Sequence, residues 1–190
     1  MTVDLRSLAV TVLTASIVAL AAPVCAGCSK GKAGGDGGVD VSGTALKSKD
    51  GRFQVTLPKS WHTSTGLNAE ASIEAEGPEG YLVVLTDPKE DLADPALPKY
   101  ATSRAQAIVK NIEGGKIGPQ LEVSVGGHRA LQSELSGTTK GIHVMYLLTV
   151  VETPSHLHQV LAWTTKSKFS SSRPKLANIT ATFSETTPGL

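Results

Sequence analysis

Residues 120–165 constrain the fold most strongly, because they hold a row of segments with strand patterning and very short connections. Short connections that contain glycine or proline join antiparallel neighbours. In the segment 142–152, apolar residues occupy both alternating faces, which is typical of a central strand that is covered on both sides. The region therefore predicts an antiparallel sheet buried on both faces, with strands at 120–125, 129–136, 142–152 and 156–165.

Two helices are predicted around this meander. Apolar residues recur every three or four positions from Leu97 to Ile112, which predicts a helix that begins near Pro98 and ends at Gly114-Gly115. A second helix is expected over 168–183, with Pro174 in its first turn. Strands and helices that alternate in this way indicate an α+β domain.

The segment before these elements predicts further strands. Asp50-Gly51 is a hairpin turn signal within 44–57, and alternation places Phe53, Val55 and Leu57 on one face. Two more strands are expected at 69–76 and 81–86, on either side of a Gly-Pro-Glu-Gly turn.

The pattern Phe53-x-Val55-x-Leu57-Pro58-x-x-Trp61 resembles the opening of PsbP-like domains, and the later order of elements matches over about 44–185. The resemblance implies an α/β/α sandwich with a central, mainly antiparallel twisted sheet. It also implies a non-catalytic accessory or binding role beside membrane complexes, although no residue identifies a photosynthetic partner. Trp61 is expected to be buried against the edge of the sheet, and Trp163 is expected to share a core face with Leu157 and Leu161.

The N-terminus predicts the location. An apolar run, Leu8 to Ala22, precedes Ala26-Gly27-Cys28, which resembles the cleavage site of lipoprotein signal peptides. Cys28 is therefore expected to be the first mature residue, to carry lipid and to attach the protein to a membrane. The alternatives are an uncleaved anchor, or a redox pair formed by Cys25 and Cys28.

This interpretation divides the chain into three parts: 1–27 as signal peptide, 28–43 as a Gly-rich flexible tether, and 44–190 as a single globular domain. The domain would face the extracytoplasmic side of the cell envelope. Ser29 stands where an aspartate would retain the protein, so the outer membrane is expected if the cell has two membranes.

Composition and missing motifs narrow the function. A net charge of +1 and few aromatic residues disfavour a nucleic-acid binder. The G-x-S-x-G elbow, the phosphate loop and the dinucleotide fingerprint are absent from the sequence. A non-enzymatic interaction or accessory module for a protein complex, without a cofactor, is the expected function. The alternative is a small-molecule or metal binder, or a weak hydrolase.

His156 and His158 are the candidate metal ligands, since residues two apart on a strand share a face. A direct hairpin would place His143 about seven residues, roughly 23 Å, from His158, while His62 and His128 cannot be placed. The acidic segment 87–94 lacks the central glycine of a calcium loop. No metal site was therefore expected, and the histidine pair is a weak candidate only.

Overall fold

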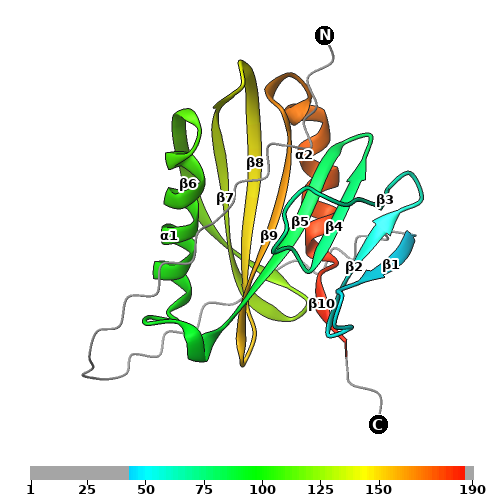
Figure 1. Cartoon of the computed structure of the whole chain (residues 1–190), viewed down its shortest axis with the longest axis vertical. Helices are drawn as coiled ribbons and strands as arrows, with labels where there is room; N and C mark the ends of the chain where they lie inside the picture. The colour runs from blue at the N-terminus through cyan, green and yellow to red at the C-terminus, as the bar shows by residue number, and fades with distance from the viewer. Residues whose placement is uncertain (1–42, 187–190) are drawn as a thin grey trace.

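A computed structural model describes residues 43–186. The predicted signal peptide, Cys28 and most of the predicted tether lie outside the described residues. A seven-stranded antiparallel sheet in the order β3-β4-β5-β9-β8-β7-β6 forms the centre, and a small sheet β1-β2-β10 lies beside it (Figure 1). The elements are β1 Gly43–Lys47, β2 Phe53–Pro58, β3 His62–Thr63, β4 Ile73–Gly77, β5 Gly80–Pro88, η2 Lys89–Asp91, α1 Leu97–Lys110, β6 Glu113–Val125, β7 His128–Thr139, β8 Ile142–Glu152, β9 His156–Thr165, α2 Lys166–Ala181 and β10 Ser184–Glu185.

The central strand β8 supports both layers of the core, because its side chains alternate between the two faces of the sheet. Tyr146, Leu148 and Val150 pack with α1 on one face, and Leu147 and Val151 pack with α2 and the small sheet on the other. Figure 1 shows α1 beside β6–β8, and α2 beside the small sheet. The predicted α+β class and the α/β/α sandwich with its antiparallel sheet are confirmed.

The meander β6–β9 confirms the predicted strand order, but β6 is longer than expected. It begins at Glu113 rather than at 120, and α1 ends earlier, at Lys110, so Gly114-Gly115 does not cap the helix. Gly114 has φ +62 at a register shift of β6, and a Cβ on Gly115 would lie 2.3 Å from the Val109 carbonyl oxygen. Gly114 therefore permits a bulge in β6, and Gly115 allows β6 to approach α1 closely.

The position of Pro174 was predicted wrongly. It lies in the middle of α2 rather than in the first turn, because the helix already begins at Lys166 and Phe169 buries its first turn. Proline there removes the bond to the Ser170 carbonyl. Pro174 and Ser170 are both exposed, so water can satisfy that carbonyl.

The N-terminal hairpin β1–β2 and the burial of Phe53, Val55 and Leu57 are confirmed. The strand predicted at 69–76 was partly wrong: β4 begins only at Ile73, because the side chain of Asn68 accepts a bond from the Glu70 N–H and forms a turn. Among residues 43–186, no helix is both long and apolar enough to cross a membrane.

Candidate functional site

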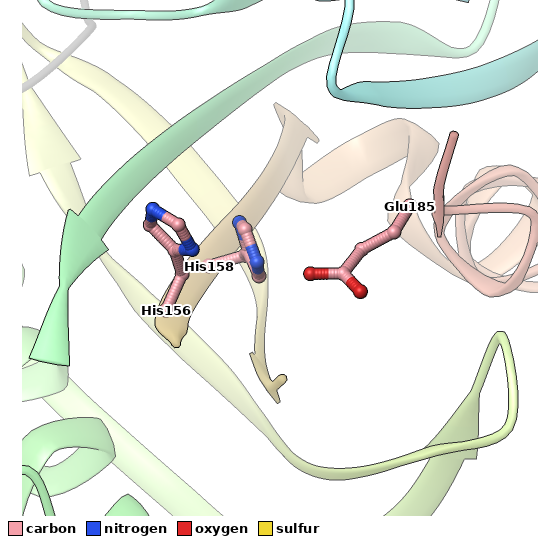
Figure 2. Close-up of side chains that lie close together, drawn as sticks. All are labelled: His156, His158 and Glu185. Atoms are coloured by element: carbon pink, nitrogen blue, oxygen red, sulfur yellow. The ribbon is translucent and has the colours of Figure 1, made fainter. Parts of the chain in front are cut away.

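The polar cluster of most interest lies where β9 begins, next to β10 (Figure 2). His156 and His158 share one face of β9, as predicted, with ring centroids 5.7 Å apart. Glu185 comes from β10 and points toward this pair. One ligand atom from each of the three residues lies within 4.8 Å of the others.

His158 is completely buried, and both of its ring nitrogens face hydroxyl groups. The Oγ1 of Thr86 lies 3.0 Å from Nδ1, and the Oγ1 of Thr153 lies 3.2 Å from Nε2. The rings of Phe53 and Phe183 pack against the imidazole, with centroid distances of 4.4 and 4.9 Å. The imidazole is thus held in one orientation by two threonines and two aromatic rings.

The protonation state of His158 follows from this setting. Burial, together with the smaller electrostatic influence of His156, His128 and Arg52, lowers the pKa of His158 to about 3. Burial disfavours the charged imidazolium because water no longer solvates it. His158 is therefore neutral at neutral pH, and one of its two ring nitrogens keeps a lone pair.

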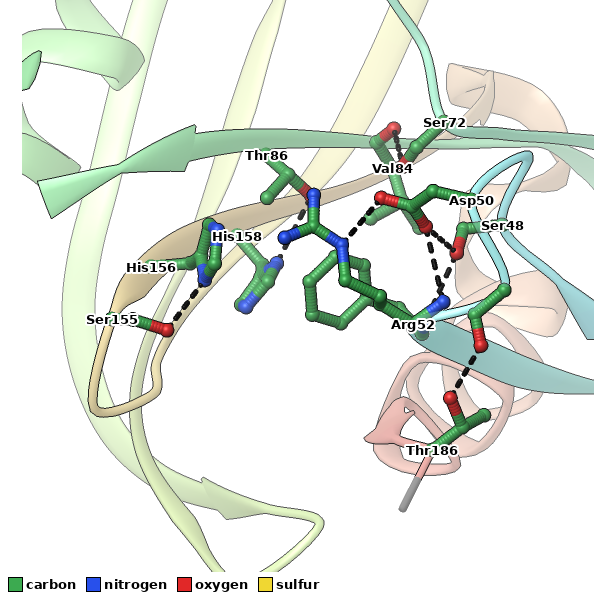
Figure 3. Close-up of polar contacts among 12 residues, drawn as sticks. Ser48, Asp50, Arg52, Ser72, Val84, Thr86, Ser155, His156, His158 and Thr186 are labelled. Atoms are coloured by element: carbon green, nitrogen blue, oxygen red, sulfur yellow. Dashed lines mark hydrogen bonds and ion pairs between the residues drawn. The ribbon is translucent and has the colours of Figure 1, made fainter. Parts of the chain in front are cut away.

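An ion pair on the β1–β2 connection forms the rim of the cluster (Figure 3). Arg52 lies over the ring of Phe53, 5.6 Å from the centroid, and its Nε donates to Asp50 at 2.7 Å. The hydroxyl of Ser48 donates to Asp50 at 2.6 Å, and this bond, together with those from Arg52, holds the pKa of Asp50 at about 2. Asp50 therefore offsets much of the positive charge of Arg52 beside the histidines.

Two members of the site were missed by sequence analysis: Glu185 and His128. Nε2 of His128, at the start of β7, lies 4.0 Å from Oε2 of Glu185. A Cβ on Gly126 would lie 2.6 Å from the Phe183 carbonyl oxygen, so the β6–β7 turn packs closely against the residues before β10. Nothing in residue spacing could have indicated this, because the tertiary fold alone brings 128, 156 and 185 together.

The other predicted candidates lie elsewhere. His143 contacts Thr138 at the opposite end of β8, and His62 pairs with Glu76 on β3 and β4, so neither reaches His158. The direct hairpin register predicts Val150 opposite His158, but in the structure His158 faces Val151, so the predicted register is wrong by one residue. The separation of His143 from His158 still agrees with the sequence argument.

The acidic segment 87–94 does not converge on one point. Asp87 accepts bonds from the Tyr100 hydroxyl and from Arg104, at 3.0 Å for the latter, whereas Asp94 pairs with Lys99 at 2.6 Å. Burial and the adjacent Asp87 carboxylate raise the pKa of the Tyr100 hydroxyl. Asp87 thus joins β5 to α1, whereas Asp94 is engaged at the start of α1.

Both tryptophans are core residues, as predicted. Trp61 is 6% exposed and packs on the α2 side, and its Nε1 donates to Glu79 at 2.7 Å. Trp163 is fully buried on the α1 side with Leu157 and Leu161.

An open hollow of about 330 Å³ lies between the β1–β2 hairpin and the chain around β3 and β4. Lys47, Lys49 and Glu74 supply charged groups to its lining. The Oε2 of Glu74 already accepts the backbone N–H groups of Leu67 and Asn68, at 2.6 and 3.3 Å. The Glu74 carboxylate is therefore already engaged in fixing the chain before β4.

No protein-family model matches the sequence, and no curated protein sequence matches it. LpqN of Mycobacterium tuberculosis, described as involved in cell envelope biogenesis, has 16% identity and a TM-score of 0.53; 76% of this chain and 90% of LpqN are covered. The cyanobacterial PsbP (CyanoP) of Synechocystis sp. PCC 6803 has 11% identity and a TM-score of 0.54, over 80% of this chain and 98% of CyanoP. A Bacteroides thetaiotaomicron structure has 13% identity and a TM-score of 0.55, over 78% of this chain and 50% of that protein. These likenesses show that the chain has a PsbP-like fold.

Proposed function

We propose that this chain is a lipoprotein of the cell envelope whose PsbP-like domain acts as a non-catalytic interaction module for a protein complex. The lipid sits on Cys28, the tether 28–43 spans the distance to the membrane, and the domain faces the extracytoplasmic side. The observation that carries the proposal is the order of the parts: Ala26-Gly27-Cys28 after an apolar run, then a Gly-rich tether, then a PsbP-like fold.

The fold supports a role of this kind. LpqN is described as involved in cell envelope biogenesis and CyanoP as a cyanobacterial PsbP, and both have a fold similar to that of this domain. Function on a shared fold depends on the individual surface, so the partner must be found by experiment.

The anchor is tested with two cysteine variants in intact cells. Cys28→Ala is expected to abolish metabolic labelling with an acyl chain and to release the protein from membranes in detergent-free extracts. Cys25→Ala is the matched control, because Cys25 leaves with the signal peptide and its loss should change neither result. Unchanged acyl labelling in Cys28→Ala would refute the proposed anchor.

The interaction role is tested by photo-crosslinking in the same cells. Ile117 and Leu121 on β6 are large apolar residues that are 43% and 53% exposed, so a crosslinking side chain there leaves the core undisturbed. Glu90, exposed in the η2 turn that precedes α1, is the third position. Discrete protein adducts that depend on Cys28 are expected at one of these positions. Their absence at all three, with the protein correctly anchored, would argue against an interaction module.

A further inference from the structure

We propose that His156, His158 and Glu185 form a binding site for a divalent transition metal of the zinc class. The proposal is independent of the anchor, and it concerns the domain alone. Two imidazoles and one carboxylate are the donor set of many zinc sites that keep a fourth position for water. The β8–β9 hairpin supplies the two histidines, and the third ligand, Glu185, comes from β10, outside that hairpin.

The spacing of the three ligand atoms is close to that of a bound metal. They lie within 4.8 Å of one another, and bonds of about 2.0–2.2 Å to a tetrahedral ion would bring them to about 3.3 Å. The residue that can close this difference is Glu185. It is exposed, and its strand β10 is only two residues long, whereas His158 is held on all sides.

The hydrogen bonds of His158 indicate which nitrogen would bind the metal. Thr153 Oγ1 contacts Nε2 at 3.2 Å, but it also lies 3.3 Å from the His156 carbonyl oxygen. If a metal takes Nε2, Thr153 keeps that carbonyl as its partner. Thr86 stays on Nδ1 at 3.0 Å and fixes the ring, as outer contacts of metal-bound histidines commonly do.

His156 lies at the open side of the cluster. Ser155 Oγ contacts its Nδ1 at 2.8 Å, and the imidazole is only half-buried, so an ion can reach it from solvent. Nε2 of His128 stands 4.0 Å from Oε2 of Glu185, too far for a direct hydrogen bond, and borders the same carboxylate.

Arg52 places a positive charge beside the histidines, which would repel a cation (Figure 3). Its guanidinium is paired with Asp50, and the side chain is 59% exposed, so solvent and the carboxylate both weaken the repulsion. The competing interpretation of the cluster is a buried neutral histidine that two threonines satisfy. That interpretation predicts no ion dependence, so the two can be separated by measurement.

The test uses the full-length chain, purified in detergent without a polyhistidine tag. Zn²⁺ is titrated by calorimetry, and melting temperatures are compared in excess chelator and in Zn²⁺. An ion that binds only the folded state raises the melting temperature by mass action, so a rise of several degrees and one ion per chain are expected. Equal melting temperatures in chelator and Zn²⁺ would overturn the proposal.

The variants identify the ligands. Glu185→Gln and His156→Gln should each weaken Zn²⁺ binding by at least about tenfold. His62→Gln is the matched control, because His62 is an exposed histidine beside a different carboxylate, Glu76, and its loss should leave binding unchanged.

Cys25 and Cys28 could bind zinc in unprocessed chain, so Cys25→Ser/Cys28→Ser is measured in parallel. Binding is expected to persist in that variant. Binding that disappears there, or that survives in both Glu185→Gln and His156→Gln, would overturn the proposed site.

Discussion

Replacing Trp61 with alanine is expected to lower the free energy of unfolding by about 3–5 kcal/mol. Trp61 is 6% exposed and belongs to the α2-side core with Phe53, Val55 and Leu57. An aromatic side chain buries about 150–250 Å², which at about 25 cal/mol per Å² corresponds to about 4–6 kcal/mol. That figure is an upper bound, because the unfolded chain already buries part of this area.

Two contacts refine the magnitude. The indole fills the space over Gly77 so closely that a Cβ there would lie 2.4 Å from Cδ1, so alanine at 61 leaves a cavity that backbone cannot easily close. Glu79 loses the bond from Nε1 but keeps Lys175 at 2.8 Å, so no unpaired buried carboxylate adds to the cost. Burial raises the pKa of Glu79, but bonds from Lys175 and Trp61 outweigh it and leave that pKa low.

The assay is urea unfolding followed by far-UV circular dichroism, since Trp61 is itself one of the two fluorescent tryptophans. Trp61→Phe keeps most of the apolar contact and loses one hydrogen bond, so a cost of about 1–2 kcal/mol is expected. His62→Ala, at the exposed neighbour, should stay within about 0.5 kcal/mol of the parent. An unchanged midpoint and slope for Trp61→Ala would show that the indole does not support the core in this way.

Two further predictions concern buried polar groups. In chelator, the free energy of unfolding should fall by roughly 3–5 kcal/mol as pH drops from about 6.5 toward 3. The reason is that His158 takes up a proton in the unfolded chain, whereas in the folded protein its pKa is about 3. Urea unfolding at successive pH values would measure this loss, which should be smaller in His158→Gln. A slope identical in His158→Gln would assign the acid sensitivity to other groups. Asp87→Asn should lower the free energy of unfolding by about 2–4 kcal/mol, because the Tyr100 hydroxyl and Arg104 lose a charged partner. A double-mutant cycle with Arg104→Met should show strong coupling between the two residues. Additive effects in that cycle would contradict the network.

The sequence by itself determined the elements whose patterns are local. In 142–152 every second residue faces the same layer, and both layers are apolar, so the segment could only be a central strand. The apolar stripe from Leu97 to Ile108 is also a local pattern, because a helix repeats its buried face every three or four residues. The connections within 120–165 are short, so consecutive strands there had to be antiparallel neighbours.

Only the tertiary structure decided where distant segments meet. Glu185 and His128 carry no pattern that links them to His156, yet the β6–β7 turn and β10 bring all three beside the start of β9. Pro174 is tolerated in the middle of α2 because that face of the helix is exposed, a property that local spacing does not reveal. Contacts between residues far apart in sequence depend on how whole layers pack, and such contacts add Glu185 and His128 to the histidine pair that the sequence already indicated.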